Sequence, residues 1–434
     1  IPFFMVHLKA ITAALNQNVI KLETSKVLSV LEKQVLAKIH RMIFQCDDKF
    51  YQTYVQNTQT ALGTFTSGGT TANITALWVA RNKIFTPKAG FSSIEEDGFL
   101  AAMAAHDLDR VVVIVSKRGH FSLRKAGGLL GIGNANVIAV DVDHHLTIDI
   151  DKLEALIQDL KNQGRTKIAA IVGIAGATET GMIDPLPTLA DICERENIHF
   201  HVDASWGGPV LMSERYRDLL AGIERADSVT IDCHKQFYMP MTSGMIYFKD
   251  PNAMDAIVYH ARYVNRKGSL DLGIKTLEGS REASSLILDA ALKIMGTRGY
   301  GLMIEHGIET ARAFAEKIKN RSQFELVSSP TLNILTYRAV PATIRADLDA
   351  ATAQGQTERV RDLNRTLDEI NINLQRIQRE TGKSFVSRTR LKRMPEDDYN
   401  VVVLRSVIMN PLTTPDILDE ILDEQESILS VLYQ

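Results

Sequence analysis

Residues 168–203 read IAAIVGIAGATETGMIDPLPTLADICERENIHFHVD. Ile168–Ile174 is a continuous apolar run of strand length, Leu186–Glu196 has apolar residues at helical spacing, and His199–Asp203 is a second strand-like run. A strand, a helix and a strand in this order are typical of a parallel βαβ unit. This stretch therefore predicts an α/β fold built on a parallel sheet.

The same alternation continues on both sides of this stretch. Further strand-like runs lie at Val111–Val115, Val137–Asp141, Ser228–Asp232 and Gly244–Phe248. We therefore expect one mostly parallel, doubly wound sheet within a large domain at residues 51–295. Ligands of such sheets bind at the carboxyl ends of the strands, which points to Asp203 and Asp232.

The two ends of the chain lack the regular alternation of strands and helices. Residues 6–45 read as helical, so we expect residues 1–50 to form an arm that packs on another subunit. The chain begins at Ile1, and we expect its natural N-terminus to be missing. Residues 296–434 read as a smaller α+β domain. Its expected elements are helices at 301–319, 363–377 and 416–432 and strands at 332–338 and 401–408.

Composition excludes several classes of protein. The 434 residues carry 49 basic and 52 acidic side chains, a net charge of −3, which argues against a nucleic-acid partner. No apolar run approaches the roughly 20 residues of a membrane span. The three cysteines form no CxxC pair or disulfide framework, so we expect a cytoplasmic protein.

Three familiar kinds of site fit the sequence poorly. Gly128–Gly133 lacks the GxGxxG spacing of a dinucleotide loop, and Thr66–Gly69 lacks the first glycine of a GxSxG elbow. His199, His201 and Asp203 share one face of a strand and could converge on a metal ion. No cluster nearby in the sequence completes a ligand shell, so we expect no metal.

Four separate pieces together suit pyridoxal 5′-phosphate. Gly63–Asn73 is a glycine-rich loop leading into an expected helix at Ile74–Ala80, and a helix N-terminus binds phosphate. Lys235 could form a Schiff base with the cofactor's aldehyde. Asp203 could keep the pyridine nitrogen protonated, and the flat ring of His120 could stack on the cofactor.

Several stretches carry a family resemblance. HVDASWGG at His201–Gly208, ADS at Ala226–Ser228 and DCHK at Asp232–Lys235 resemble the signature of the group II pyridoxal-phosphate-dependent amino-acid decarboxylases. That family includes glutamate, aromatic amino-acid, diaminobutyrate and some aspartate decarboxylases, and the resemblance extends from Pro2 to Pro411. It implies a fold-type-I enzyme, a carboxy-lyase whose small-molecule substrate is an amino acid. It also implies a homodimer with active sites at the subunit interface.

The resemblance implies a role for each matching residue. Lys235, His120 and Asp203 would be catalytic. Arg405 would bind a substrate carboxylate, unless it is paired with an acidic residue of its own chain. The implied cofactor-binding residues are Gly69, Thr70, His120, Thr178, Asp203, Ser205, His234 and Lys235.

One feature departs from the family pattern. Many members carry a tyrosine on a mobile loop that reprotonates the substrate carbon. The corresponding stretch is roughly Ala261–Leu277, and the place of the tyrosine falls near Asp271. Tyr263 lies too early, so the sequence leaves the proton donor open.

The expected substrate follows from Arg405, because an arginine fork suits a carboxylate. Asn16–Ser25 and Gly279–Ser285 are similar to bacterial pyridoxal-dependent aspartate 1-decarboxylases, which supply β-alanine for pantothenate. We therefore expect conversion of L-aspartate to β-alanine and carbon dioxide. Glutamate is the second candidate, since one methylene discriminates by only about 1–3 kcal/mol. Diaminobutyrate or an aromatic amino acid follows, and a catalytically idle relative would be expected to lack Lys235.

Overall fold

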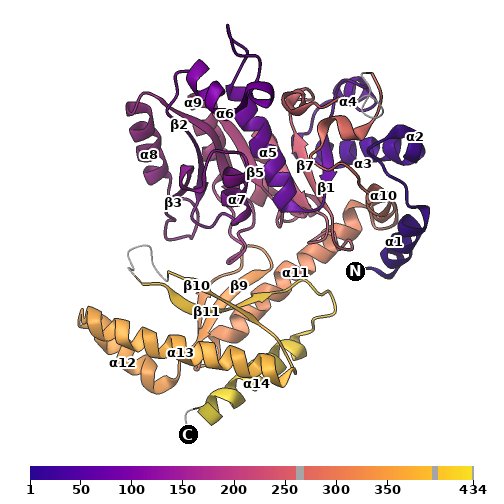
Figure 1. Cartoon of the computed structure of the whole chain (residues 1–434). Coiled ribbons are helices and arrows are strands. Elements are labelled where there is room, and N and C mark those ends of the chain that lie inside the picture. The colour runs from indigo at the N-terminus through magenta and orange to yellow at the C-terminus, as the bar shows by residue number, and fades with distance from the viewer. Residues whose placement is uncertain (261–267, 393–398, 433–434) are drawn as a thin grey trace. The chain divides into compact units, whose positions relative to one another are not determined.

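The computed structural model describes residues 1–260, 268–392 and 399–432. The chain forms two compact units (Figure 1). The first comprises residues 1–142, 147–176 and 183–302. The second comprises residues 143–146, 177–182 and 303–434.

A seven-stranded sheet forms the centre of the first unit. Its strand order is β1-β7-β6-β5-β4-β2-β3, and the five strands from β3 to β6 in that order are parallel. Only β7 runs antiparallel to its neighbours β6 and β1. The mostly parallel sheet expected from the sequence is thus confirmed. The strands are β1 (Gly63–Thr66), β2 (Arg110–Ser116), β3 (Val137–Val140), β4 (Thr166–Ile174), β5 (His199–Asp203), β6 (Ser228–Asp232) and β7 (Gly244–Phe248).

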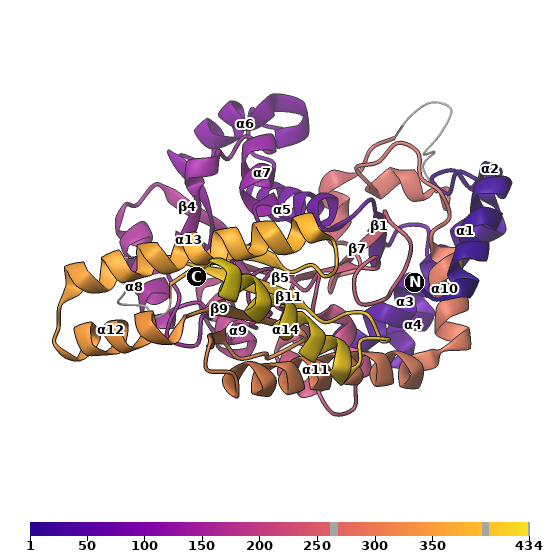
Figure 2. The same cartoon turned by 90° about the horizontal axis from the view of Figure 1, so that it is seen from below.

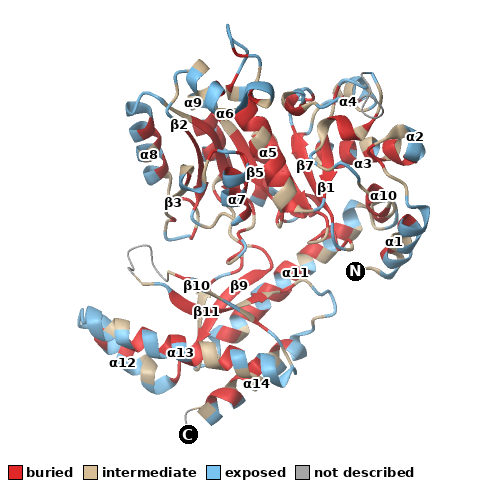
Figure 3. Ribbon diagram, viewed as in Figure 1, coloured by how far each residue is buried: buried red, intermediate tan, exposed pale blue. Residues whose placement is uncertain are grey.

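Burial explains why these segments are strands. The runs Val111–Val115 of β2 and Ile168–Ile174 of β4 are buried along their length (Figure 3). Continuous β-branched and aliphatic runs suit strands covered on both faces. The covering helices are α5 (Gly69–Ile84), α7 (Ser122–Leu129), α8 (Ile150–Asn162) and α9 (Leu186–Glu196). Helix α6 (Ile94–Ala105) follows α5 in the chain.

Helix α5 begins earlier than the sequence suggests. The expected helix at Ile74–Ala80 in fact starts at Gly69, directly after the glycine-rich loop. Thr70 and Thr71 are weak helix formers, but α5 packs against β1 and β4–β7, and such packing overrides local preference. The buried start of α5 therefore lies beside the carboxyl ends of the strands.

The N-terminal residues are helical, as expected, and belong to the first unit. Helix α1 packs on α10, with Met5 and Thr12 buried. In the described ranges, no helix is both long and apolar enough to cross a membrane. The helices of this arm and of the end of the first unit are α1 (Phe3–Leu15), α2 (Leu22–Ser25), α3 (Val27–Phe44), α4 (Asp48–Tyr54) and α10 (Ser285–Ile294).

The second unit contains an antiparallel sheet in the order β10-β11-β9-β8. Helix α13 packs against β11 and β9, and α12 lies beside α13 (Figure 2). The seam expected at residues 363–377 is on α13, where Leu363, Leu367, Ile370 and Leu374 are buried. The elements are β8 (Phe324–Ser328), β9 (Ile334–Ala339), β10 (Ser387–Leu391), β11 (Val401–Val407), α12 (Ala342–Ala353), α13 (Thr357–Thr381) and α14 (Pro415–Leu432). Helix α11 (Gly296–Lys319) begins in the first unit and belongs to the second from Met303 onward.

Candidate active site

Asp203 is held as a buried, ionised carboxylate at the carboxyl end of β5. Its Oδ1 accepts hydrogen bonds from Ser205 Oγ at 2.6 Å and from Ser205 N at 3.1 Å. Its Oδ2 accepts one from Asn73 Nδ2 at 2.8 Å. Burial pushes the pKa of Asp203 upward, but these hydrogen bonds and the positive charge of Lys235 outweigh burial, so the pKa lies below its usual value. The carboxylate can therefore face a protonated ring nitrogen.

Lys235 follows β6 and presents its amine beside a second carboxylate. Lys235 Nζ lies 3.0 Å from Asp232 Oδ2. Asp232 is buried, whereas the side chain of Lys235 is 29% exposed. Burial raises the pKa of Asp203 and the hydrogen bond from Ser205 lowers it. The positive charge of Lys235 has the next largest effect and lowers this pKa further. The amine, the buried carboxylate at β5 and the end of β6 thus form one cluster.

The start of α5 meets the same cluster. A Cβ at Gly69 would lie 2.6 Å from Ser205 Oγ and 2.9 Å from Asp232 Oδ2. A Cβ at Gly68 would lie 3.4 Å from the His234 ring, and His234 Nδ1 lies 2.6 Å from the carbonyl oxygen of Ser243. Thr70 follows in the first turn of α5, whose N–H groups favour an anion. Only a residue without a side chain fits at position 69.

His120 is tied to this cluster through two other side chains. A Cβ at Gly119 would lie 2.4 Å from Val115, so the chain turns tightly after β2 and places His120 next. His120 Nδ1 lies 2.8 Å from Ser122 Oγ, which in turn accepts a hydrogen bond from Asn73 Nδ2 at 3.1 Å. His120 and Asp203 are therefore linked through Ser122 and Asn73.

Both ring nitrogens of His201 have hydrogen-bond partners within the protein. His201 Nδ1 lies 2.9 Å from Ser228 Oγ, and His201 Nε2 lies 3.1 Å from Asn73 Oδ1. Burial lowers the pKa of His201 to about 4, so the ring is neutral at pH 7. Both ring nitrogens are used by the protein, and no cluster of three or more metal-ligating side chains occurs among the described residues.

Thr178 and Arg405 belong to the second unit, where they contact each other. Arg405 Nε donates a hydrogen bond to the carbonyl oxygen of Thr178 at 2.6 Å, and its Nη1 lies 3.4 Å from Ser387 Oγ. Burial lowers the pKa of Arg405, while the nearby Glu179 raises it. Across the ranges that the structure describes, no carboxylate lies within ion-pair distance of this guanidinium. The alternative of an ion pair within the chain is therefore not found there.

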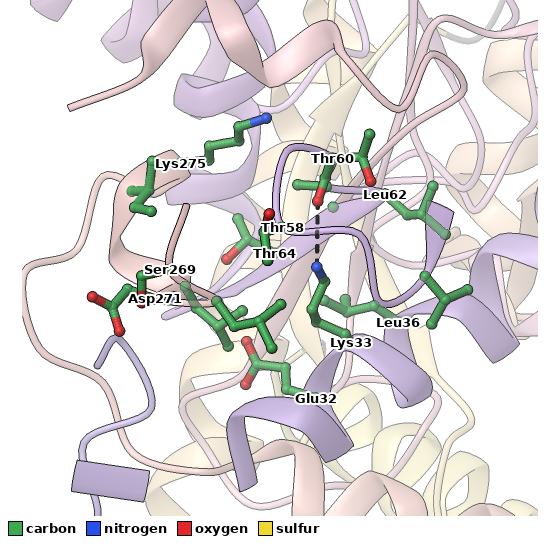
Figure 4. A pocket seen from close by; sticks show the side chains of 16 residues that line it. Glu32, Lys33, Leu36, Thr58, Thr60, Leu62, Thr64, Ser269, Asp271 and Lys275 are labelled. Atoms are coloured by element: carbon green, nitrogen blue, oxygen red, sulfur yellow. Dashed lines mark hydrogen bonds between the residues drawn. The ribbon is translucent and has the colours of Figure 1, made fainter. Parts of the chain in front are cut away.

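Asp271 has a structural partner. Its Oδ1 accepts a hydrogen bond from the backbone N–H of Leu22 at 2.8 Å, which fixes the start of α2. The surrounding segment 269–275 lines a cavity of about 50 Å³ together with residues of α3 and β1 (Figure 4). Tyr263 lies outside the described residues.

The structure thus brings together most of the site residues named from the sequence. Gly69, Asp203, Ser205, His234 and Lys235 meet at the carboxyl ends of β5 and β6. They offer an amine, an ionised carboxylate and a side-chain-free helix start, which fit the aldehyde, ring nitrogen and phosphate of pyridoxal 5′-phosphate.

Sequence reasoning missed the supporting residues. Asn73, Ser122 and Ser228 were given no role, and Asp232 was noted only as a strand end where ligands bind, although all four are buried in this region. Asn73 lies four residues after Gly69, on the same face of α5. That spacing, and the position of Ser122 two residues after His120, are signals that could have identified them.

Comparison with known proteins agrees with this chemistry. Residues 5–340 match the model of the pyridoxal-dependent decarboxylase conserved domain. The chain is 48% identical over 430 residues to an aspartate 1-decarboxylase from Aliivibrio fischeri, covering 99% of this chain and 78% of that protein. It is 32% identical over 289 residues to an L-2,4-diaminobutyrate decarboxylase from Acinetobacter baumannii, covering 64% of this chain and 56% of that protein.

The fold agrees as well. The crystal structure of mouse CSAD superposes with a TM-score of 0.83 at 25% identity, covering 99% of this chain and 82% of that one. The expected fold-type-I architecture, the cofactor and the enzyme class are confirmed. The chain belongs to the pyridoxal-dependent decarboxylase family, carboxy-lyases that use pyridoxal 5′-phosphate.

Proposed function

We propose that this enzyme removes the α-carboxyl group of L-aspartate and releases β-alanine and carbon dioxide. The main support for aspartate as the substrate is the 48% identity, over nearly the whole chain, to an aspartate 1-decarboxylase. Arg405 supports it, because its guanidinium is half-buried and no carboxylate of the described residues lies within ion-pair distance of it, although Glu179 is near enough to raise its pKa. A half-buried guanidinium without an ion pair in its own chain can bind the carboxylate of an acidic substrate.

The chain's own residues divide the remaining work. Pyridoxal 5′-phosphate, when bound, provides the electron sink for the pair left on the substrate's α-carbon. Lys235 would hold the aldehyde carbon, Asp203 would keep the ring nitrogen protonated, and His120 would stack on the ring. Gly69, Thr70 and His234 would hold the phosphate. Ser205 would lie on the face opposite His120, and Thr178 near the ring.

Orientation decides which bond breaks. Only a bond perpendicular to the ring plane overlaps its π system, so the residues that fix the substrate select decarboxylation. Arg405 would bind the side-chain carboxylate of the substrate. The bond to the α-carboxylate could then lie perpendicular to the ring plane. Glutamate offers the same carboxylate one methylene further away and is the second candidate substrate.

The decisive experiment measures carbon dioxide release from purified protein supplied with pyridoxal phosphate. Aspartate, glutamate, diaminobutyrate and tyrosine should be compared side by side, with each amine product identified. Preference for aspartate with formation of β-alanine would support the proposal. Preference for glutamate would replace the substrate and leave the reaction class intact.

We also propose that the enzyme is a homodimer with active sites at the subunit interface. Helix α1 buries Met5 but exposes 76% of Phe3, 48% of Ile11 and 47% of Leu15. These three exposed residues lie eight and then four residues apart, so they share one broad face of the helix. An apolar helix face of this kind suits a second copy of the arm. Analytical ultracentrifugation should find a dimer, and Phe3→Asp should weaken it.

A further inference from the structure

Asn73 lies at the centre of a buried network that reaches Asp203 and His120. Its Nδ2 donates to Asp203 Oδ2 at 2.8 Å and to Ser122 Oγ at 3.1 Å. Its Oδ1 lies 3.1 Å from His201 Nε2. Asn73, Ser122 and His201 are each at most 1% exposed. Water therefore does not compete for these hydrogen bonds.

The ionised carboxylate of Asp203 fixes the direction of every hydrogen bond in one branch. A carboxylate only accepts, so Asn73 must direct its NH₂ group at Asp203 and its carbonyl oxygen at His201. His201 must then carry hydrogen on Nε2, and its Nδ1 must accept from Ser228 Oγ, 2.9 Å away. The hydroxyl hydrogen of Ser228 is already donated to His201, so Ser228 Oγ accepts a hydrogen bond from His199 Nε2 at 2.8 Å. The donor and the acceptor of every hydrogen bond in this branch are therefore determined.

The second branch follows from the same amide. Ser122 Oγ accepts from Asn73, so its own hydrogen is available for His120 Nδ1 at 2.8 Å. The backbone N–H of Ser122 also points at His120 Nδ1, at 3.3 Å. A nitrogen that receives two donors carries no hydrogen, so neutral His120 has its hydrogen on Nε2.

We propose that Asn73 is a positioning residue that holds Asp203 and His120 in one hydrogen-bonded unit and sets the tautomers of His120 and His201. The proposal rests on the proposed roles of Asp203 and His120 toward the cofactor. Asn73 contacts neither substrate nor cofactor in this scheme. It acts by keeping Asp203 ionised and aimed, and by keeping Nε2 of His120 as the protonated nitrogen.

The tautomers can be read directly by ¹⁵N NMR of the full chain labelled at histidine. The measurement uses cofactor-free protein, so it does not depend on the proposed reaction. His120→Gln and His201→Gln identify the two signals by their loss. Both histidines should show an unprotonated Nδ1 and a protonated Nε2. A protonated Nδ1 on neutral His201 would require the amide of Asn73 to be reversed and would overturn the proposal.

Substitution of Asn73 tests the link to the cofactor. Asn73→Ala should weaken pyridoxal phosphate binding on the order of tenfold, because a hydrogen bond to a charged group is lost. It should also shift the visible band of the bound cofactor and lower kcat with little change in KM. Ser122→Ala should disturb only the His120 branch and cost less cofactor affinity than Asn73→Ala.

Asn371→Ala is the matched control. Asn371 is also fully buried and bonds Ala339 and Leu367, but it belongs to the second unit and none of its hydrogen bonds among the described residues involves a residue of this network. Asn371→Ala should lower stability and leave the cofactor band unchanged. If Asn73→Ala behaved in the same way, with unchanged cofactor affinity and kcat, its role would be structural and the proposal would fail. A substrate other than aspartate would leave all these expectations unaltered.

Discussion

Lys235 Nζ lies 3.0 Å from Asp232 Oδ2, three residues earlier in the chain. Asp232 is buried, and its other oxygen, Oδ1, has no hydrogen-bond partner within the described residues. The lysine is therefore the main compensation for a buried negative charge as well as the proposed attachment point of the cofactor. These two roles can be separated experimentally.

Lys235→Ala should abolish both carbon dioxide release and borohydride trapping of the cofactor, since the amine is lost. It should also destabilise the cofactor-free protein by about 1–3 kcal/mol, because Asp232 is left unpaired. Lys235→Arg keeps a cation beside Asp232 but offers no amine, so it should recover stability and remain inactive. Decarboxylation by Lys235→Arg would refute the assignment.

Arg405→Gln should raise KM for aspartate and glutamate by about 10- to 100-fold, because a charged hydrogen bond to the substrate is lost. Tyrosine and diaminobutyrate should be affected much less. Arg390→Gln is a suitable control, because Arg390 lies on the neighbouring strand β10 and is paired with Asp368. Steady-state kinetics with all four substrates decide the point, and an equal loss for each would make Arg405 structural.

Gly69→Ala should weaken pyridoxal phosphate binding, because its Cβ would press on Ser205 and Asp232. Overpacking of this kind costs about 1–3 kcal/mol. Gly279→Ala provides the control, since no atom lies within 4 Å of a Cβ at that position. Fluorescence titration with the cofactor measures both variants. Equal affinities would show that the start of α5 does not bind the phosphate.

His40 should make the fold sensitive to acid. Burial lowers the pKa of His40 to about 4, and its Nε2 lies 3.0 Å from the carbonyl oxygen of Phe248. Between pH 6.5 and 4 the unfolded chain binds a proton at His40 that the folded chain does not, so stability falls as pH falls through this window. At pH 5 the loss from this residue should be about 2 kcal/mol.

Urea unfolding at pH 7 and pH 5 measures that loss. His40→Gln should reduce the difference between the two pH values, and the exposed His7→Gln serves as the control. A reduction of the same size in both variants would contradict the role of His40. His199 and His201 are buried in the same way and should account for part of the remaining difference.

The sequence predicted those parts of the fold whose local pattern agrees with their burial. β4, α9 and β5 were expected at nearly their observed bounds, because apolar runs and helical spacing both reflect covered faces. β10 was not expected, since Ser387–Leu391 reads SRTRL and alternates exposed and half-buried residues at the edge of its sheet. Short edge strands carry little apolar signal.

Some residues of the candidate active site could be predicted from the sequence and others could not. Asp203 and Lys235 were identifiable because strand ends and a family motif mark them. The spacing of Asn73 from Gly69 indicates the face of α5 on which it lies, but not its partner, because Asp203 is 130 residues away and the pairing depends on which faces of α5 and β5 meet. Tertiary hydrogen bonds of this kind leave no periodic pattern in the chain.

The second unit is assembled from separate pieces of the sequence. Residues 143–146 and 177–182 belong to it, although most of it begins at Met303. A chimera that exchanges only residues 303–434 with a relative would leave both short segments behind, including Thr178, which Arg405 contacts. Under the proposed role of Arg405, transplanting substrate preference between members of this family requires a three-part graft in which residues 143–146 and 177–182 are transferred together with the C-terminal sequence.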